Sequence, residues 1–308
     1  MRNCEQVTGT RVLLNNVLFA TDFSVAAHAA LPYALAIARH YGSKFHAVHV
    51  IPELDIVVRP QDTNPISYES AFAAESCAAL ARMREVIPEL GTMPHDVYVC
   101  RGPVWRAISE TIAQQHIDLL VVGTHGRTGI GKLLMGSVAE ELLHRAPCPV
   151  LTVGPRAGGR VKEEFDQTGK DTRSAEIELK QIIFATDFTP ESLAAAPFAI
   201  SLAEEFQARL GLMHVIDPNH PTPSALVLQH LEGLVPKEAA FWCTPEALVK
   251  YGVPATEILR VSSERNADIV VLGVRAAKAH LAPAIHLPWS TAHRVIAASS
   301  CPVLTVRK

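Results

Sequence analysis

The stretch NNVLFATDFS at residues 15–24 returns as KQIIFATDFT at residues 180–189. Two further pairs of segments keep the same order: DLLVVGTHG (118–126) with DIVVLGVRA (268–276), and APCPVLTV (146–153) with SSCPVLTV (299–306). Self-similarity that keeps its order along a chain indicates tandem copies of one domain. A chain of 308 residues is also long for one hydrophobic core, which independently favours two domains.

Between the two copies, the segment AGGRVKEEFDQTGKDTRSAEIE (157–178) is charged, contains glycine and is poor in apolar residues. That composition is typical of a linker. We therefore expect a first domain at residues 11–156, a linker at 157–178 and a second domain at 179–308.

Within the first copy, short apolar runs alternate with helical patterns. We expect strands at about 16–20, 44–51, 95–100, 118–123 and 149–153, and helices at about 24–40, 69–85, 102–115 and from 136 onward. This alternation predicts an α/β fold in each copy, Rossmann-like, with a five-stranded parallel sheet covered by helices on both faces. If the strand order is 3-2-1-4-5, a ligand binds beyond the first and fourth strands, which end at Asp22 and Gly123.

The composition limits the kinds of partner that the protein has. With 48% hydrophobic residues and a mean hydropathy of +0.17 the chain is not disordered, and its net charge of −3 gives no overall attraction to nucleic acid or anionic lipid. It has no long apolar run, no signal-peptide core at its N-terminus and no C-x-x-C pair among its six cysteines. These features predict a cytoplasmic protein without a membrane or nucleic-acid partner.

The glycine-rich segment VVGTHGRTGIGKLLMGSV (121–138) is the strongest candidate for a binding site. Its substring GRTGIGKL (126–133) nearly spells a P-loop, but Leu133 stands where that motif requires a magnesium-binding hydroxyl. The match also begins three residues after Gly123, whereas a P-loop follows its strand directly. We therefore interpret the P-loop match as accidental.

The same segment has other features that favour a phosphate. Gly123 and Gly126 leave backbone N–H groups approachable, and the last helix begins at Gly136, where its first N–H groups and dipole favour an anion. Arg127 and Lys132 lie between these glycines and are suited to charge-assisted contacts. The alternative is that the glycines only shape a long turn.

The spacing Gly123-x2-Gly126-x9-Gly136-Ser137 resembles the ATP-binding signature of the universal stress proteins, and VLFATDFS and CPVLTV look like that family's first and last strands. The resemblance covers nearly all of both copies. It implies the adenine nucleotide α-hydrolase-like fold with ATP, with or without Mg²⁺, in the predicted crevice. It also implies the contacts: Ala20 and Thr21 line the base, Asp22 lies at the ribose or adenine, Val50 faces the adenine, Val122 and Gly123 border the ribose, and Gly126, Gly136, Ser137 and Val138 hold the phosphates.

Some of these residues have a competing interpretation. Asp22 either contacts the ligand or caps the helix that follows it. His49 and His214 recur in the second strand of each copy, and we interpret them as core residues. Cys148 and Cys301 precede proline in each last strand and are expected to be small buried residues.

A zinc site in the second copy is a further alternative. His280, His286 and His293 lie near one another in sequence and would need Cys243 or a carboxylate to complete a site. Pro288 makes a continuous helix across these histidines unfavourable, so we assign no metal ligand.

We interpret the protein as an ATP-binding regulatory protein of the stress response rather than an enzyme. A hydrolase needs a positioned base and usually a metal ligand near the γ-phosphate, and no such set is visible, so no catalytic residue is assigned. The alternatives are a slow ATP hydrolase or a nucleotidyl-transfer enzyme of the same fold, or an ATP-free interaction scaffold.

The second copy departs from the nucleotide pattern. Gly273 is retained, but Gly126 is matched by Ala276 and Gly136 by Trp289, whose ring would fill the space for phosphates. We therefore expect one ATP per chain. Because both copies end in CPVLTV, an apolar strand that would leave an exposed edge, we also expect these edges to pair within the chain as a pseudo-dimer and the chain to form a homodimer. A protein partner is expected but not identified.

Overall fold

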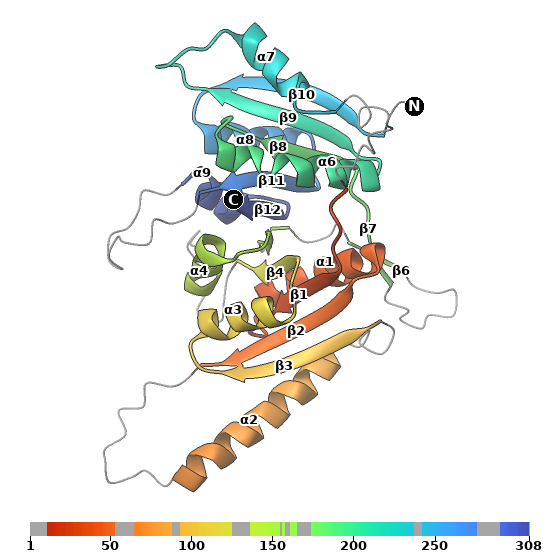
Figure 1. Ribbon diagram of the computed structural model, residues 1–308, viewed down its shortest axis with the longest axis vertical. Helices are drawn as coiled ribbons and strands as arrows, with labels where there is room; N and C mark the ends of the chain where they lie inside the picture. The colour runs from red at the N-terminus through yellow and green to blue at the C-terminus, as the bar shows by residue number, and fades with distance from the viewer. Residues whose placement is uncertain are drawn as a thin grey trace, which may run out of the picture. The chain divides into compact units, whose positions relative to one another are not determined.

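The computed structural model describes residues 11–52, 65–87, 93–124, 136–154, 156–157, 161–164, 174–236, 242–275 and 290–307. The chain divides into two compact units. The first unit spans residues 14–177, and the second unit spans residues 178–308 together with the N-terminal residues up to Leu13. Figure 1 draws the first unit from red to yellow-green and the second from green to blue.

The first unit alternates strands and helices along most of its length. Its elements are β1 (Asn16–Ala20), α1 (Val25–Tyr41), β2 (Lys44–Ile51), α2 (Pro65–Val86), β3 (His95–Arg101), α3 (Val104–Gln114), β4 (Leu119–Gly123), α4 (Ser137–Arg145), β5 (Val150–Val153), β6 (Val161–Glu164) and β7 (Ser174–Ile177). The predicted strands and helices of the first copy are all present.

The five main strands of the first unit form a parallel sheet in the order β3-β2-β1-β4-β5. This order, 3-2-1-4-5, is the one on which the expected location of the ligand depended. Ala20 at the end of β1 is in register with Val48 of β2 on one side and with Val122 of β4 on the other. The strand order reverses at β1 and β4, which places the start of the β1–α1 turn beside the end of β4.

Helices cover both faces of this sheet because its strands are apolar on both. On one face, α3 and α4 pack against each other and over a core that includes Leu18, Val48, Leu120 and Val150. Since successive strand residues point to opposite faces, the neighbouring positions, such as Phe19, face the other side, where α1 packs against β1 and β4.

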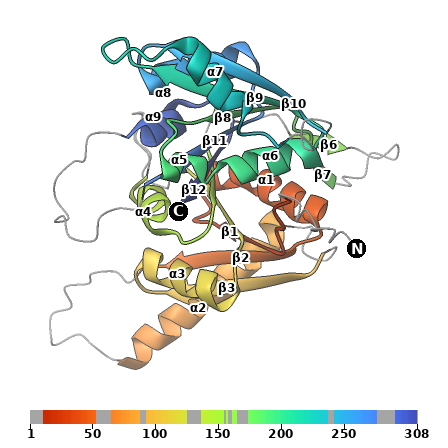
Figure 2. The ribbon, with the colours of Figure 1, turned by 45° about the horizontal axis from the view of Figure 1, so that its top comes forward.

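The segment expected to be a linker contains ordered structure. Strands β6 and β7 pair antiparallel, with Val161 opposite Ile177, and both pack against α1. This hairpin lies beside α1 in both ribbon views (Figures 1 and 2). The Tyr33 hydroxyl of α1 also donates to the carbonyl of Ala157 (2.7 Å), so the chain beyond β5 is fixed to the first unit.

A polar cluster lies within the sheet of the first unit at its amino end. Buried His46 of β2 stacks on Tyr98 of β3, and its two ring nitrogens contact the Tyr98 hydroxyl (3.3 Å) and the Asn16 side-chain oxygen (3.2 Å). Burial lowers the pKa of His46, although the nearby Asp96 carboxylate opposes that shift. Burial raises the pKa of Tyr98 to about 12, and its hydrogen bond to Asp96 acts in the same direction.

The second unit repeats the architecture. Its elements are β8 (Gln181–Ala185), α5 (Pro190–Leu193), α6 (Ala196–Glu205), β9 (Arg209–Ile216), α7 (Ser224–Glu232), β10 (Thr244–Tyr251), α8 (Pro254–Glu264), β11 (Ile269–Val274), α9 (Thr291–Ala298) and β12 (Val303–Arg307). The strands are parallel in the order β10-β9-β8-β11-β12, which is the order of the first unit repeated.

Residues 11–13 belong to the second unit. Arg11 forms a salt bridge with Glu205 of α6 (2.7 Å), and the Val12 amide donates to the Ser201 hydroxyl (2.8 Å). The sequence placed residues 11–13 in the first domain. The structure differs because contacts made far along the chain, rather than neighbours in sequence, determine where these residues pack.

Candidate functional site

A cavity of about 360 Å³ lies at the predicted switch point of the first unit. The ends of β1, β2 and β4 and the starts of α1, α3 and α4 surround it. Its lining residues are Ala20, Thr21, Asp22, Ser24, Ala27, Val48, Val50, Pro52, Val104, Ile108, Val122, Gly123, Thr124, Gly136, Ser137, Val138, Ala139 and Leu142.

Nine of the eleven predicted site residues line this one cavity: Ala20, Thr21, Asp22, Val50, Val122, Gly123, Gly136, Ser137 and Val138. The other two, Gly126 and Arg127, lie outside the described residues, as does Lys132. Residues predicted from four separate segments of the chain therefore line the same cavity.

Other lining residues were missed. Val48 was predictable in principle, because it precedes Val50 by two residues in a strand and so points to the same face. Val104 and Ile108 come from α3, and nothing in their local sequence indicates that this helix reaches the site. Their contribution follows only from the packing of α3 over the sheet.

The turn between β1 and α1 holds Asp22 at the edge of the cavity. The Asp22 carboxylate accepts a hydrogen bond from the Ser24 amide (2.9 Å), and the Ser24 hydroxyl accepts from the Ala27 amide (3.2 Å). Ser24 is therefore the N-cap of α1, and the alternative that Asp22 caps this helix is wrong. Asp22 instead shapes the turn and presents its carboxylate to the cavity wall.

The turn is supported from behind by a histidine. Phe23 has a positive φ of 61°, which is uncommon for a residue with a side chain. Its ring lies 4.6 Å from that of His49, and the His49 Nδ1–H donates to the carbonyl of Thr21 (2.8 Å). The second unit repeats this arrangement: Phe188 also has φ 61°, and His214 bonds the carbonyl of Thr186 at 2.8 Å. His49 is buried, which confirms its interpretation as a core residue.

Gly123 at the end of β4 has a packing role. A Cβ atom added there would lie 2.5 Å from the carbonyl carbon of Ala26, because the start of α1 comes so close to the strand. At the equivalent Gly273, a Cβ would lie 2.2 Å from the carbonyl oxygen of Glu191. Both units therefore require glycine at this position, whatever they bind.

The helix α4 points its first turn at the cavity. Its N-cap is Gly136, in extended conformation and without a side-chain capping bond, so Ser137 is its first helical residue and not its cap. The Gly136 amide donates to the carbonyl of Thr124 (2.8 Å), which joins the two ends of the loop between them. The next amides of α4, which belong to lining residues Ser137 to Ala139, have no acceptor one turn earlier in the helix and are suited to an anion.

A second cavity, of about 170 Å³, lies at the same place in the second unit. Thirteen positions that line it are equivalent in the repeat to positions that line the first: Ala20/Ala185, Thr21/Thr186, Asp22/Asp187, Ser24/Thr189, Ala27/Ser192, Val48/Met213, Val50/Val215, Val104/Pro254, Ile108/Ile258, Val122/Leu272, Gly123/Gly273, Val138/Thr291 and Ala139/Ala292. The second cavity is therefore the counterpart of the first.

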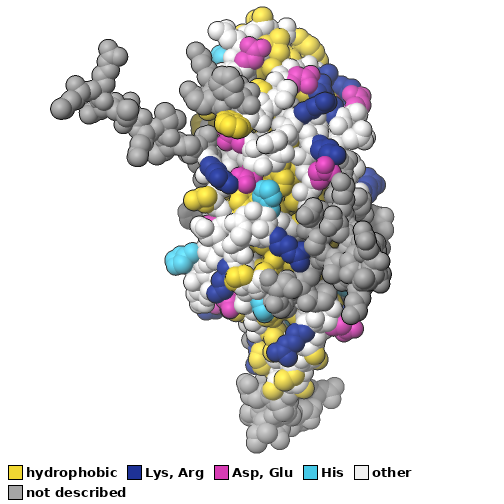
Figure 3. All heavy atoms as spheres, turned by 90° about the vertical axis from the view of Figure 1, so that its right-hand side faces the viewer, with side chains coloured by type: hydrophobic (Ala, Val, Ile, Leu, Met, Phe, Trp, Pro, Cys, Tyr) yellow, Lys and Arg dark blue, Asp and Glu magenta, His cyan; other side chains and the backbone are white. Residues whose placement is uncertain are grey.

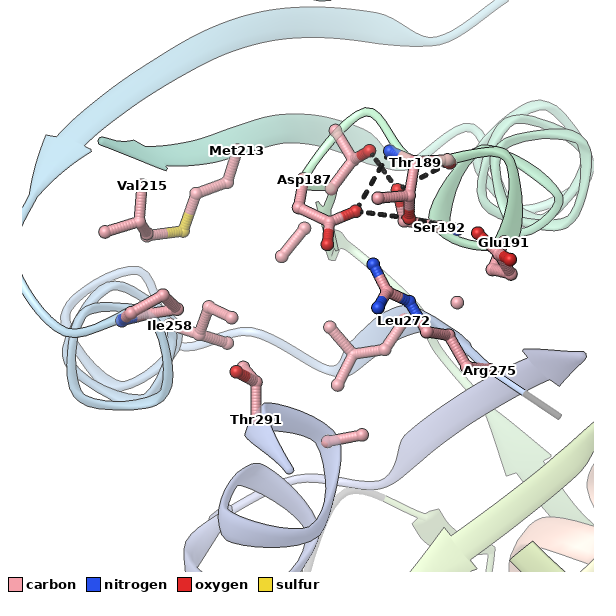
Figure 4. A pocket seen from close by; sticks show the side chains of 15 residues that line it. Asp187, Thr189, Glu191, Ser192, Met213, Val215, Ile258, Leu272, Arg275 and Thr291 are labelled. Atoms are coloured by element: carbon pink, nitrogen blue, oxygen red, sulfur yellow. Dashed lines mark hydrogen bonds between the residues drawn. The ribbon is translucent and has the colours of Figure 1, made fainter. Parts of the chain in front are cut away.

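The second cavity also has two charged lining residues that have no counterpart among the described lining residues of the first. Glu191 and Arg275 stand on one side of it, opposite Met213, Val215 and Ile258 (Figure 4). The Arg275 guanidinium is directed toward Asp187. Burial alone would raise the pKa of Asp187, but hydrogen bonds from Thr189 and Ser192 and the charge of Arg275 lower it below the usual value.

The helix α9, whose first residues line this second cavity, also begins differently from α4. The hydroxyl of Ser290, the N-cap of α9, accepts from the His293 amide (3.3 Å). One of the first-turn amides of α9 is thus already bonded within the chain. Ala276 and Trp289, which distinguish the second copy in sequence, lie outside the described residues.

The cysteines and histidines give no sign of a reactive or metal-binding centre in the described part of the chain. Cys148 and Cys301 are buried, as predicted, and burial raises the pKa of Cys148 to about 12. Among the described residues, no three histidine, cysteine or acidic side chains come together in a way that could hold a metal ion. His280 and His286 are outside those residues.

Surface charge is mixed on the face shown in Figure 3, where lysine and arginine side chains alternate with aspartate and glutamate. None of the described helices combines the length and the apolar character needed to cross a bilayer.

Comparison with known proteins gives a consistent result. Residues 14–154 and 178–307 match the family model described as the universal stress protein family. A universal stress protein of Methanocaldococcus jannaschii is 29% identical over 141 residues, which are 46% of this chain and 82% of that protein. Universal stress protein A homolog 1 of Coxiella burnetii is 31% identical over 140 residues, which are 45% of this chain and 94% of that protein.

One solved structure is similar along nearly the whole chain. The crystal structure of a universal stress protein from Archaeoglobus fulgidus has a TM-score of 0.68 at 22% identity, and the match covers 96% of this chain and 99% of that one. At this level of identity the likeness shows the fold alone.

Proposed function

Because the chain belongs to the universal stress protein family, we propose that its first unit binds ATP in the cavity beside β1 and β4. The observation that carries the proposal is that nine residues chosen from the sequence as nucleotide contacts line a single cavity. Its volume of about 360 Å³ falls within the range of small-molecule sites.

One side of the cavity suits a nucleoside. Val48, Val50, Ile108 and Val122 supply apolar surface for a flat base, and Asp22 supplies a carboxylate acceptor for ribose hydroxyls. The Asp22 oxygen that bonds the Ser24 amide is fixed in position by that bond, so the acceptor is preorganised.

The other side suits phosphates. The uncapped first turn of α4 presents amide hydrogens and the positive end of the helix dipole. The segment of sequence that carries Arg127 lies between Thr124 and Gly136, which both line the cavity and are joined by a hydrogen bond. A polyanion bound here would be held by backbone groups, with the loop's basic residues available for further contacts.

Binding without rapid turnover is the activity that this lining supports best. Asp22 is the only carboxylate among the described lining residues, and it lies at the nucleoside side of the proposed pose. Hydrolysis needs a base or water-positioning group near the γ-phosphate. We therefore propose a nucleotide-dependent regulatory protein of the stress response, with slow hydrolysis as the second candidate.

Calorimetry of the full chain tests the proposal. We expect one ATP per chain in the wild-type protein, and Gly136→Glu should weaken binding at least 100-fold, about 2.7 kcal/mol, because it places a negative charge beside the phosphates. Gly136→Ala is the matched control and should bind ATP, since the φ of −63° at this position suits any residue. A wild-type chain that binds no ATP would exclude the proposal, and ATP that is released as ADP within minutes would favour the enzyme.

The location of the protein and its oligomeric state are also part of the proposal. We place the protein in the cytoplasm as a homodimer, a state that light scattering would distinguish from a 33.4 kDa monomer. The predicted pairing of the two copies' last strands stays a prediction.

A further inference from the structure

The cavity of the second unit keeps one half of the first cavity and changes the other. The retained half is the apolar wall of Met213, Val215 and Ile258, with Asp187 at its edge, as Val48, Val50, Ile108 and Asp22 form it in the first unit. Figure 4 shows this wall on one side of the pocket and Asp187 between it and Arg275. In the proposed function of the first unit, this half contacts the base and the ribose.

The changed half is the one that would face phosphates. Glu191 adds a carboxylate to the lining at the repeat position that Ala26 occupies in the first unit. The described lining of the second cavity thus has two carboxylates and one guanidinium, whereas that of the first has the carboxylate of Asp22 alone; the net charge is −1 in both, but a second carboxylate is added. The charge of Arg275 already acts on Asp187, so it is not free to compensate several phosphate charges.

The volume of the second cavity and the start of the helix that borders it also make it less suited to a polyanion. The second cavity has about 170 Å³ against about 360 Å³ in the first. The Ser290 hydroxyl accepts a hydrogen bond from the His293 amide at the start of α9, whereas α4 has no side-chain cap. Each of these differences removes a feature that would favour a polyanion and leaves the apolar half in place.

We propose that the cavity of the second unit binds a ribonucleoside that carries no phosphate. The apolar wall contacts the base, and Asp187 accepts a hydrogen bond from a ribose hydroxyl. Its Oδ1 already accepts from the Thr189 amide (3.0 Å) and hydroxyl (2.6 Å), and Ser192 also hydrogen-bonds this carboxylate. A carboxylate has about four lone-pair sites, so one remains for the ribose. The inference rests on the proposed function of the first unit, because it interprets the retained half by analogy with that site.

Calorimetry with adenosine and with ATP on the full chain tests this inference. We expect the wild-type protein to bind two adenosine molecules but one ATP. The matched variants Val50→Phe and Val215→Phe each fill one cavity at an equivalent position. Val50→Phe should leave one adenosine and no ATP, and Val215→Phe should leave one adenosine and one ATP.

A second pair of variants replaces each cavity carboxylate by an amide of the same shape, so that the fold should be kept. Asp187→Asn keeps the side-chain oxygen that receives the Thr189 amide and removes the charge, so it should weaken one of the two adenosine sites about tenfold and leave ATP unaffected. Asp22→Asn should weaken the other adenosine site and ATP together.

The outcomes separate this inference from the proposed function. One adenosine and one ATP per chain would overturn the inference and leave the proposed function intact. Two ATP molecules per chain would also overturn it, because phosphates would then be accepted by the second cavity. Adenosine that still binds Val50→Phe when no ATP binds the wild-type protein would support the inference and refute the proposed function.

Discussion

In the first unit, the helix that borders the cavity begins with an uncapped glycine; in the second unit, the equivalent helix begins with a serine that caps it. Asp22 and Asp187, by contrast, make the same turn, and Gly123 and Gly273 make the same close approach to a helix. The close approach of the helix backbone explains by packing alone why both units keep this glycine, whereas the uncapped helix start belongs to the first unit alone. The glycine at the end of β4 therefore says less about phosphate than its place in a binding signature suggests.

The comparison predicts its largest effect at these two glycines. Gly123→Ala and Gly273→Ala should each destabilise their own unit by on the order of 3 kcal/mol, because the new methyl group would overlap the helix backbone. Hydrogen exchange followed by mass spectrometry reports on each unit separately. If Gly273→Ala leaves the second unit unchanged, packing does not explain why both copies have glycine here.

The second-largest loss of stability is expected for substitution of the histidines that bond the turn after the first strand of each unit. His49→Ala and His214→Ala should each cost about 2 kcal/mol in the free energy of unfolding of their unit, since both lose a hydrogen bond to a turn carbonyl and a ring contact with phenylalanine. Urea denaturation of each variant gives the values. A large effect in one unit and none in the other would mean that the two turns are not supported in the same way.

Substitutions at the starts of α4 and α9 should have a smaller effect, and one that differs between the two units. Ser290→Ala removes a side-chain cap and should cost about 1 kcal/mol in the second unit. Ser137→Ala is the matched control, because Ser137 makes no capping bond, and it should change the stability of the first unit by less than about 0.5 kcal/mol. Equal losses in the two thermal melts would contradict the difference between these helix starts.

The smallest expected effect is a dependence on pH that belongs to the first unit. Burial sets the pKa of His46 below its ordinary value of 6.5 in the folded protein. The stability that His46 contributes is therefore fully present above pH 6.5 and is lost as the pH falls through the lowered folded value. The second unit has Gly211 at this position, packed against the side chains of Ile183 and Leu248, and lacks the titrating group.

Hydrogen exchange between pH 7 and pH 5 measures this last effect. Protection in β2 should fall more than protection in β9 after correction for the intrinsic rate of exchange. His46→Leu should reduce the difference between the two strands. A decline that is equal in both, or one that His46→Leu leaves unchanged, would assign the pH dependence to other groups.

Much of this architecture could be predicted because the relevant signals are local and occur twice. The alternation of apolar runs with helical patterns predicted the strands and helices of each copy, and the strand order 3-2-1-4-5 was the condition that placed Asp22 and Gly123 at one cavity. The β6–β7 hairpin could not be predicted in this way, since its residues are charged and its stability comes from packing on α1. Glu191 and Arg275 are ordinary surface residues in sequence, and only the structure places them in one cavity.

The salt bridge of Arg11 and the hydrogen bond of Val12 have a consequence for synthesis of the chain. Val12 and its partner Ser201 are 189 residues apart, and the whole first unit lies between them. At translation rates of 5–20 residues per second, the N-terminal segment waits roughly 10–40 s on the ribosome before α6 emerges. The first unit is completed at Ile177, before α6 is made, whereas the earliest-made residues of the second unit have nothing to pack against until α6 emerges. The order of synthesis therefore makes the first unit the earlier to fold and leaves the N-terminal segment accessible to proteases and chaperones until the second unit forms.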